Sequence, residues 1–283
     1  FYKFSFTIQQ VIKGRAYIYY NSIGYMLLLV LSMGLSSCFK EKLLSPPNNQ
    51  NRGQVAVIEM GPQYNDQFFY SLATNTVLKR NSRFAYDLMF DCAPNQFHIW
   101  LNTAKFMIVK RTDKTDLDSV QLSDTLHGVW HYEFGAFNPD SNAIGQWWDS
   151  AAGPSLSAGK VYLLQMGVDN DGNPFGYVKF KVNNFFGDSY SITYSNFVNP
   201  PQTISIQKND NYCYRYLSLT GTGSFPDIEP TKANWDLCFT RYSVFFYAPY
   251  NIPYQVTGVL HNPSRVSAYM DSTTIFDSVG IST

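Results

Sequence analysis

Strict alternation of apolar and polar side chains is the feature that most constrains what this chain can fold into. In Gly176–Val182, two Val and one Phe lie on one side of an extended backbone, while one Tyr and two Lys lie on the other. Ser189–Ser195 alternates in the same way, and Lys160–Met166 predicts a third strand. Asp169–Asn173 supplies the Asn, Asp and Gly residues that tolerate positive φ in a hairpin turn. The pattern predicts a three-stranded antiparallel meander over 160–195. Because no other segment after the N-terminal leader shows a convincing helical period, it also predicts an all-β protein.

Composition agrees with an exported β-protein. Charged residues make up 15% of the chain, which is low against the usual share of about a quarter. Aromatic residues make up 17%, and Tyr and Phe suit pleated, half-buried surfaces. Lys plus Arg and Asp plus Glu both number 21. The chain therefore has no basic field that would attract nucleic acid, and we predict no nucleic-acid partner.

An apolar run that ends in small residues and a cysteine predicts a lipoprotein signal peptide. The run Met26–Leu35 is ten residues long, whereas a membrane-spanning helix needs about 20. Lys13 and Arg15 provide a basic region upstream. Leu35-Ser36-Ser37-Cys38 matches a lipobox, in which small residues let the peptidase seat the backbone and the cysteine sulfur takes a diacylglycerol. We therefore predict lipidation of Cys38.

Cleavage before Cys38 defines the first two segments of the chain. Residues 1–37 are the predicted signal peptide, and 38–54 are a lipid-anchored tether containing the polar stretch Pro46–Asn51. Such a tether lets the folded part stand off the membrane. The predicted location is the outer membrane, as a lipoprotein on its periplasmic or cell-surface face.

A long internal repeat organises the rest of the chain. Tyr86–Phe90 recurs as Trp235–Phe239. Two further matches keep the same order, so that all three spacings fall between 147 and 159 residues: Tyr70–Leu72 with Leu217–Leu219, and Leu117–Val120 with Phe276–Val279. A repeat this long indicates a duplicated domain. We predict a first β domain over 55–200 and a second over 201–283. We expect the second to be incomplete, because the sequence ends before any equivalent of the meander. Either the gene stops early or the chain is cut at its C-terminus, and the cut is favoured because a sheet without its last strands has open edges.

Three cysteines remain once Cys38 carries the anchor: Cys92, Cys213 and Cys238. An oxidising compartment favours disulfide formation. If the segments around Cys213 and Cys238 pair as antiparallel strands about a centre near Phe225-Pro226, the two thiols come within disulfide distance. The sequence therefore allows a Cys213–Cys238 disulfide with Cys92 as a buried thiol. Three buried free thiols are the alternative, since free Cys behaves as a small apolar residue.

One strand carries a resemblance to a known family. Residues 235–242 read Trp-Asp-Leu-Cys-Phe-Thr-Arg-Tyr and follow the turn Gly221–Ser224. This resembles the HmuY-like family of haem-binding lipoproteins, whose members carry a Trp-Asp-(Ile/Leu)-x-Phe-x-Arg-Tyr strand after a Gly-, Ser- and Asp-rich turn. The lipobox and an Asp-Gly hairpin turn are also similar, and the resemblance covers roughly 64–283. The first copy departs from it, with Tyr86 in place of Trp and Asp91-Cys92 in place of the Thr-Arg pair.

The resemblance implies antiparallel sheets of the HmuY-like type and capture of haem for a TonB-dependent transporter, and hence a role in iron acquisition. Characterised members hold the iron with two axial side chains, two His in some and Met in others. No motif in this chain matches those ligand positions. Candidates for haem ligands must therefore come from residue type and spacing.

The strongest ligand candidates are His127 and His131, with Met166 next. The two His are four residues apart among aromatic residues. In a strand they point the same way about 13 Å apart, too far to share one metal ion, although each could serve a haem separately. Met166 offers a soft sulfur ligand, and a Met in a strand is more often core filler. Ordinary half-buried His is the alternative for the pair.

The other two histidines have no companion that the sequence identifies. His98 alternates with Phe97 and Ile99, so we expect it to face away from their core, towards solvent or a partner. His261 stands beside Asn262-Pro263, and we expect it to lie in a loop.

Three aromatic residues are candidates for stacking on a flat ligand such as a porphyrin or a sugar ring: Trp147, Trp148 and Tyr132. Packing between sheets is the alternative. The chain has no Gly-x-Ser-x-Gly, His-Glu-x-x-His or phosphate-loop motif. The segment Asp169–Asn173 mimics the start of a calcium loop, but its Gly stands at the fourth position and not the sixth, and the twelfth position is Phe180 and not Glu. We therefore predict a binding protein and not an enzyme.

Two functions remain open from the sequence. The first is a lipid-anchored outer-membrane protein of the HmuY-like type that captures haem or a related porphyrin for iron acquisition. The alternative is a non-haem accessory or structural surface lipoprotein that partners a TonB-dependent transporter, which the small number of His, four in the whole chain, favours.

Overall fold

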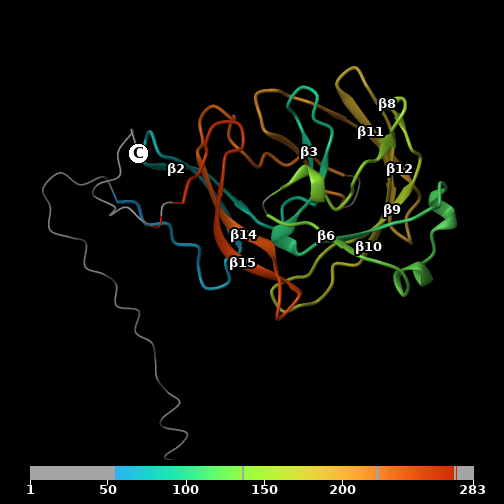
Figure 1. Cartoon of the computed structure of the whole chain (residues 1–283), viewed down its shortest axis with the longest axis horizontal. Coiled ribbons are helices and arrows are strands. Elements are labelled where there is room, and N and C mark those ends of the chain that lie inside the picture. The colour runs from blue at the N-terminus through green and yellow to red at the C-terminus, as the bar shows by residue number, and fades with distance from the viewer. Residues whose placement is uncertain (1–54, 136, 221–222, 271, 273–283) are drawn as a thin grey trace, which may run out of the picture. The chain divides into compact units, whose positions relative to one another are not determined.

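A computed structural model describes residues 55–135, 137–220, 223–270 and 272 (Figure 1). The predicted signal peptide, the lipidation site Cys38 and the tether over 38–54 lie outside the described residues, as does the repeat segment Phe276–Val279. Within the described part, no helix is both long and apolar enough to cross a bilayer.

The described residues form short strands joined by turns and by single-turn 3₁₀ helices. The strands are β1 (Asp66–Ser71), β2 (Thr76–Ser82), β3 (Leu88–Asp91), β4 (Ile99–Leu101), β5 (Ile108–Arg111), β6 (His131–Tyr132), β7 (Trp148–Asp149), β8 (Gly153–Ser157), β9 (Val161–Gln165), β10 (Tyr177–Phe186), β11 (Ser189–Ser195), β12 (Gln202–Gln207), β13 (Tyr214–Leu217), β14 (Leu237–Phe246) and β15 (Ile252–His261). The 3₁₀ helices are η1 (Thr103–Lys105), η2 (Leu117–Ser119), η3 (Leu122–Thr125) and η4 (Pro139–Ser141).

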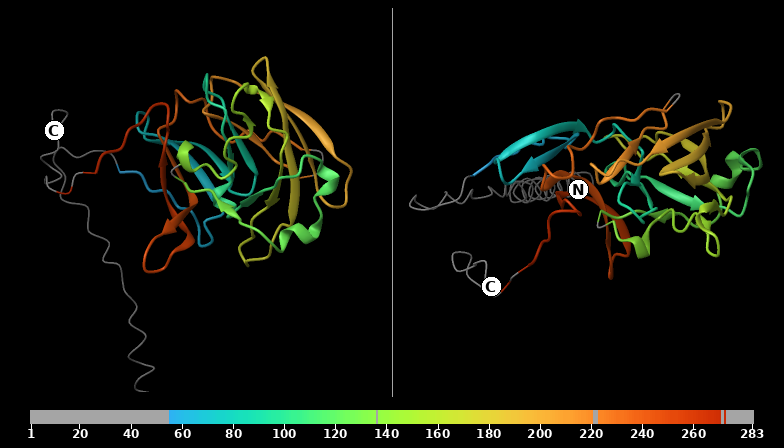
Figure 2. Two further views of the ribbon diagram at one scale, coloured as in Figure 1. Left: turned by 45° about the vertical axis from the view of Figure 1, so that its right-hand side comes forward. Right: turned by 90° about the horizontal axis from the view of Figure 1, so that it is seen from above.

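These strands build antiparallel sheets, and the all-β prediction is confirmed. A six-stranded sheet has the order β12-β11-β10-β9-β5-β6, and a four-stranded sheet has the order β15-β14-β1-β2. A three-stranded sheet, β13-β3-β4, and the pair β7-β8 complete the fold. In Figure 1 the hairpin of β14 and β15 stands on one side, and β8 to β12 stand on the other. Both views of Figure 2 keep the two groups apart.

The predicted meander is confirmed strand by strand. β9 pairs with β10 and β10 pairs with β11, both antiparallel. The turn between β9 and β10 closes where the N–H of Asp169 donates to the carbonyl of Asn173 at 3.0 Å. The Asp169 carboxylate accepts from the backbone N–H of Asp171 and of Asn173, at 2.9 and 2.8 Å. These bonds within the turn explain why an Asp/Asn-rich sequence fixes the hairpin.

The internal repeat is present in the fold, but its two copies share their sheets. Tyr70 in β1 lies opposite Leu237 in β14, and the equivalent Leu217 in β13 lies opposite Leu88 in β3. Each copy's first strand therefore pairs with the other copy's second strand. The predicted division into a domain over 55–200 and another over 201–283 does not match this pairing. Sequence similarity identifies related strands, but it does not show which strands pair.

A buried aspartate closes each of these strand pairs. The backbone N–H of Asp87 donates to the carbonyl of Leu217 at 2.8 Å, and its carboxylate accepts from the N–H of Leu219 at 2.7 Å. In the same way, the backbone N–H of Asp236 donates to the carbonyl of Tyr70 at 2.8 Å, and its carboxylate accepts from the N–H of Leu72 at 2.7 Å. Both aspartates therefore bind one copy of the repeat to the other.

A buried asparagine follows each aspartate along the chain. The N–H of Asn102 donates to the carbonyl of Asp87 at 2.9 Å, and the N–H of Asn262 donates to the carbonyl of Asp236 at 2.8 Å. Each side-chain amide also donates, at 2.8 Å, to the carbonyl of the residue before its aspartate. Both asparagines are completely buried. The similarity of the copies thus extends beyond the segments that sequence comparison matched.

A cation completes each motif, and here the copies differ. Lys105 pairs with Asp87, and their side chains are 6% and 1% exposed. Arg265 pairs with Asp236 at 2.7 Å, but the arginine side chain is 42% exposed while the aspartate is 6% exposed. Breaking a buried pair leaves an uncompensated charge, whereas an exposed partner returns to water.

We expect Asp87→Ala to lower the free energy of unfolding by about 3–5 kcal/mol, because it leaves Lys105 buried and unpaired. Asp236→Ala should cost less, about 1–3 kcal/mol, because Arg265 returns to water and the main loss is the partner of a part-buried N–H. The control is Asp210→Ala, which breaks an exposed pair with Lys232 and should cost at most about 1 kcal/mol. Urea unfolding measures all three, and equal costs for the three variants would contradict the motif.

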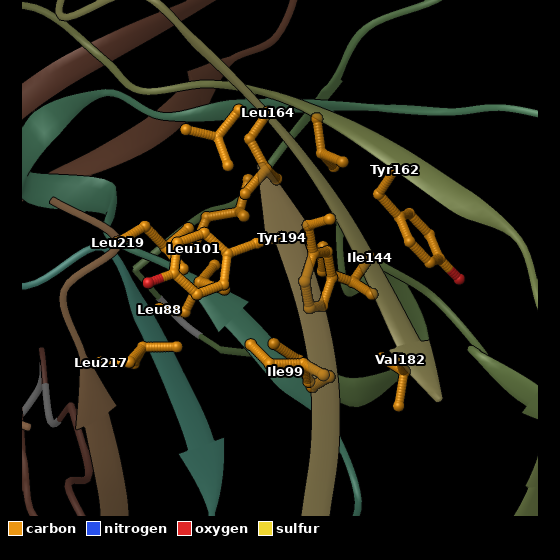
Figure 3. Packing of buried hydrophobic residues seen from close by; sticks show 14 of the residues in the cluster. Leu88, Ile99, Leu101, Ile144, Tyr162, Leu164, Val182, Tyr194, Leu217 and Leu219 are labelled. Carbon is orange, nitrogen blue, oxygen red and sulfur yellow. The ribbon is translucent and has the colours of Figure 1, made fainter. Parts of the chain in front are cut away.

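The main hydrophobic core lies between the six-stranded sheet and the face of β3 and β4. Figure 3 shows this packing. Its buried members come from β3, β4, the strands β5 and β9 to β12, the segment 143–147, and the end of β13 with the residues after it. They include Leu88, Ile99, Leu101, Leu164, Val182, Tyr194, Leu217 and Leu219. Burial of such side chains is worth about 1.5–3 kcal/mol each.

The equivalent face of the four-stranded sheet, which β1 of the first copy shares with β14 and β15 of the second, is open. Leu219 is 5% exposed, but its counterpart Leu72 is 58% exposed. Ile99 is fully buried, but its counterpart Val259 is 45% exposed. Within the described residues, nothing equivalent to the six-stranded sheet covers this side of β14 and β15.

Candidate functional site

The site begins with a histidine held by a buried carboxylate. Asp91 is the last residue of β3, and His98 immediately precedes β4. Because the β3–β4 register pairs Phe90 with Ile99, Asp91 lies beside His98. His98 Nδ1 lies 2.9 Å from Asp91 Oδ2, which also accepts the His98 backbone N–H at 2.9 Å. The other oxygen of Asp91 accepts the Trp100 indole N–H at 2.8 Å. The Asp91 side chain is 4% exposed and that of His98 is 23% exposed.

This contact assigns the tautomer of His98. A carboxylate only accepts, so the proton of the neutral imidazole lies on Nδ1 and the lone pair lies on Nε2. Histidines that bind metals almost always donate their other ring N–H to a carboxylate, a carbonyl or water, which fixes the ring and raises its basicity. In this tautomer His98 presents Nε2 as an acceptor.

His98 lines a cavity of about 300 Å³, here named the histidine cavity. Its aromatic wall runs from Trp100 to Phe137, with ring centroids 5.5 Å apart, and on to Tyr214, 6.2 Å from Phe137. The amine-bearing Lys232 also lines it. The volume is at the lower end of the range of about 300–1,000 Å³ that small-molecule sites occupy.

A second cavity, of about 200 Å³, lies between the two copies of the repeat and is here named the repeat cavity. Equivalent residues of the two copies line it in pairs: Phe69 with Tyr216, Tyr86 with Trp235, and Met89 with Cys238. It shares Phe137, Tyr214 and Pro263 with the histidine cavity. The two cavities therefore adjoin.

A buried carboxyl supports the wall between the cavities. Glu229 accepts the backbone N–H of Tyr214 at 3.0 Å and lies 3.4 Å from the hydroxyl of Tyr216. Burial raises the pKa of Glu229 to about 8. Burial also raises the pKa of Glu133, in the segment after β6, to about 8. Both groups are therefore largely protonated in the folded protein at neutral pH.

The raised pKa values of Glu229 and Glu133 predict that the free energy of unfolding falls as pH rises. A carboxyl whose folded pKa is raised binds its proton more tightly when folded, so its contribution is complete below about pH 4.5 and is lost as pH rises through about 8. Wild type should therefore lose stability over this window. Glu229→Gln should flatten the slope in part, and adding Glu133→Gln should flatten it further.

Urea unfolding at several pH values measures this slope. The exposed Glu59 supplies the control variant, Glu59→Gln, which should retain the wild-type slope. A wild-type slope in the Glu229→Gln, Glu133→Gln double variant would contradict the assignment.

The predicted haem ligands lie elsewhere. His127 is exposed, and its backbone carbonyl accepts from Lys110 Nζ. His131 is half-buried in β6, where burial and then the charge of Arg111 lower its pKa. Met166 is buried in the main core. In the described part of the chain, none of these three residues lines the histidine cavity or the repeat cavity.

The three predicted stacking residues do not form one platform. Trp147 is buried in the main core, as the packing alternative predicts. Trp148 contacts Trp147 edge-on, with centroids 5.4 Å apart, and lies 6.3 Å from the ring of His98. Tyr132 stacks on Phe134 at 6.5 Å. Of the three, Trp148 is the one next to the histidine cavity.

The hypothesis of a Cys213–Cys238 disulfide is wrong in this structure, since Cys92, Cys213 and Cys238 are all free and buried. The assumed pairing of the two segments does not occur. Cys213 directly precedes β13, which pairs with β3, whereas Cys238 in β14 lies opposite residues of β1 and β15. Burial raises the pKa of the Cys213 thiol to about 12 and that of Cys238 further. The alternative of buried thiols holds.

The Asp91–His98 contact is the feature of the candidate site that the sequence analysis missed. The alternation of residues correctly predicted that His98 faces away from the core of Phe97 and Ile99. It could not predict that the side chain contacts Asp91, seven residues upstream. Only the register of the β3–β4 hairpin brings the two side chains together.

Comparison with family models, with curated proteins and with solved structures finds no match to this chain. Within the described residues, no three His, Cys, Asp or Glu side chains gather as a metal site. The chemistry of the site therefore depends on His98 and the two adjoining cavities.

Proposed function

We propose that this protein is a lipid-anchored binding protein of the HmuY-like type that captures haem or a related porphyrin, with His98 as an axial ligand. The observation that carries the proposal is the Asp91–His98 contact at the wall of an aromatic cavity. The lipobox at Cys38 and the Trp-Asp strand of β14 agree with it. The ligand passes to a transporter, and no catalysis is involved.

The chemistry of the wall suits a porphyrin. The oriented Nε2 of His98 offers a lone pair to iron. Trp100, Phe137 and Tyr214 offer apolar aromatic surface for contact with an aromatic macrocycle. Lys232, whose ammonium also pairs with Asp210 at 2.6 Å, adds a positively charged group at the wall. The adjoining repeat cavity extends the apolar surface beyond Phe137.

Haem titration followed by absorbance tests this assignment. We expect a shifted Soret band that saturates near one equivalent for wild type and is lost in His98→Ala, because the variant removes the iron ligand. His127→Ala, at an exposed histidine, is the matched control and should bind as wild type does. If His98→Ala kept the spectrum while His127→Ala or His131→Ala lost it, the ligand would be where the sequence alone placed it.

Asp91 should act as a positioning residue. We expect Asp91→Asn to weaken haem binding about 10–100-fold, the usual effect of removing a carboxylate behind a metal-bound histidine. The near-ultraviolet circular dichroism of the variant checks that Trp100 keeps its place. Unchanged affinity in a folded Asp91→Asn protein would remove Asp91 from the mechanism.

A second candidate function, partnering a transporter without binding haem, is favoured by the open face of β14 and β15. Leu72 and Val259 are exposed there, whereas their counterparts Leu219 and Ile99 lie under a sheet. Because a β-sheet of this chain covers Leu219 and Ile99, we expect the partner to cover Leu72 and Val259 with an apolar face of a β-sheet.

The double variant Leu72→Ser, Val259→Ser should then reduce co-purification with an outer-membrane transporter from native membranes several-fold. Val198→Ser, at an exposed loop position, is the control and should not change it. This candidate also predicts no haem in the native preparation. Equal recovery of the transporter with all variants would exclude the open face as the contact.

A further inference from the structure

The repeat cavity contains two buried donors without partners. Gln67 and Trp235 both line it and are each 3% exposed. Among the described residues, neither Gln67 Nε2 nor Trp235 Nε1 has a hydrogen-bond acceptor. A buried polar group without a partner costs about 1–3 kcal/mol. Two such groups on one cavity wall point to an acceptor that occupies the cavity.

A cation lies on the same wall. Arg241 lines the repeat cavity, and no ion pair of its side chain occurs within the described residues. Its charge reaches the neighbouring Arg83, whose pKa falls to about 10, first through burial and second through Arg241. No described Asp or Glu lines the cavity. The wall therefore has a net excess of donors and positive charge.

From these observations we propose that the repeat cavity binds a small apolar carboxylate, with Gln67, Trp235 and Arg241 as its recognition groups. The carboxylate oxygens accept the two free N–H groups and neutralise the guanidinium. This site does not depend on haem binding and uses none of the residues assigned to the iron.

The rest of the cavity fits the apolar part of such a ligand. Phe69, Tyr86 and Met89 supply aromatic and thioether surface, and Phe69 packs edge-on against Trp235 with centroids 5.0 Å apart. The volume is about 200 Å³, and an apolar cavity of about 150 Å³ is enough to hold benzene. A single ring with one carboxylate is therefore of suitable size.

Benzoate is the probe, with benzamide as its neutral counterpart. Isothermal titration of the purified full chain should show one benzoate site, with benzamide at least about tenfold weaker, because a charged acceptor gains more from Arg241. Arg241→Gln should weaken benzoate about tenfold or more. Arg80→Gln removes a cation from an exposed pair with Asp66 and is the matched control that should bind normally.

Gln67→Leu gives a second readout that does not rely on the ligand. If Gln67 Nε2 is unpaired in the empty protein, this substitution should leave the free protein as stable or more stable while weakening benzoate about tenfold. His98→Ala should bind benzoate as wild type does, which separates this site from the haem proposal. The proposal is overturned if benzoate does not bind, which would leave hydration by water alone, or if benzamide binds equally well.

Discussion

The buried carboxylates of Asp87 and Asp236 are the contacts on which the rest of this structure depends. Each accepts a backbone N–H from the other copy of the repeat, at 2.7 Å, while its own N–H closes a strand pair. A carboxylate held in this way is stable in the interior only while its donors are in place. The motif therefore fixes the register of β1 on β14 and of β13 on β3, and it places the repeat cavity between the two copies.

The local sequence pattern was sufficient to predict where strands form, but not which strands pair with each other. Alternation and turn chemistry predicted the meander of β9, β10 and β11, and the repeat identified β14 as the relative of β3. The repeat did not reveal that strands of one copy pair with strands of the other, because similarity between copies is compatible with pairing within a copy or between copies. The Cys213–Cys238 hypothesis failed for the same reason, since its register assumed that two neighbouring segments of one copy pair with each other.

The residues of the candidate site were also not predictable without knowing which strands pair. Residue type and spacing favoured His127 and His131, because a pair at i, i+4 is visible in one dimension. His98 gains its partner Asp91 through a hairpin register, and Gln67 and Trp235 meet at one cavity through the pairing of β1 with β14. Long-range pairing therefore decides the site, and a single sequence does not report it. What the sequence did predict correctly is the all-β class of the fold.

The two copies of the repeat are held together by the sheets they share. Inserting a protease site at the exposed turn 209–211, between β12 and β13, and cutting it tests this directly, because the covalent link between the copies is then gone. Size-exclusion chromatography of the cut protein without denaturant should show both pieces in one peak, which separates only in urea. Two separate peaks in native buffer would show that each copy folds by itself and would contradict the account.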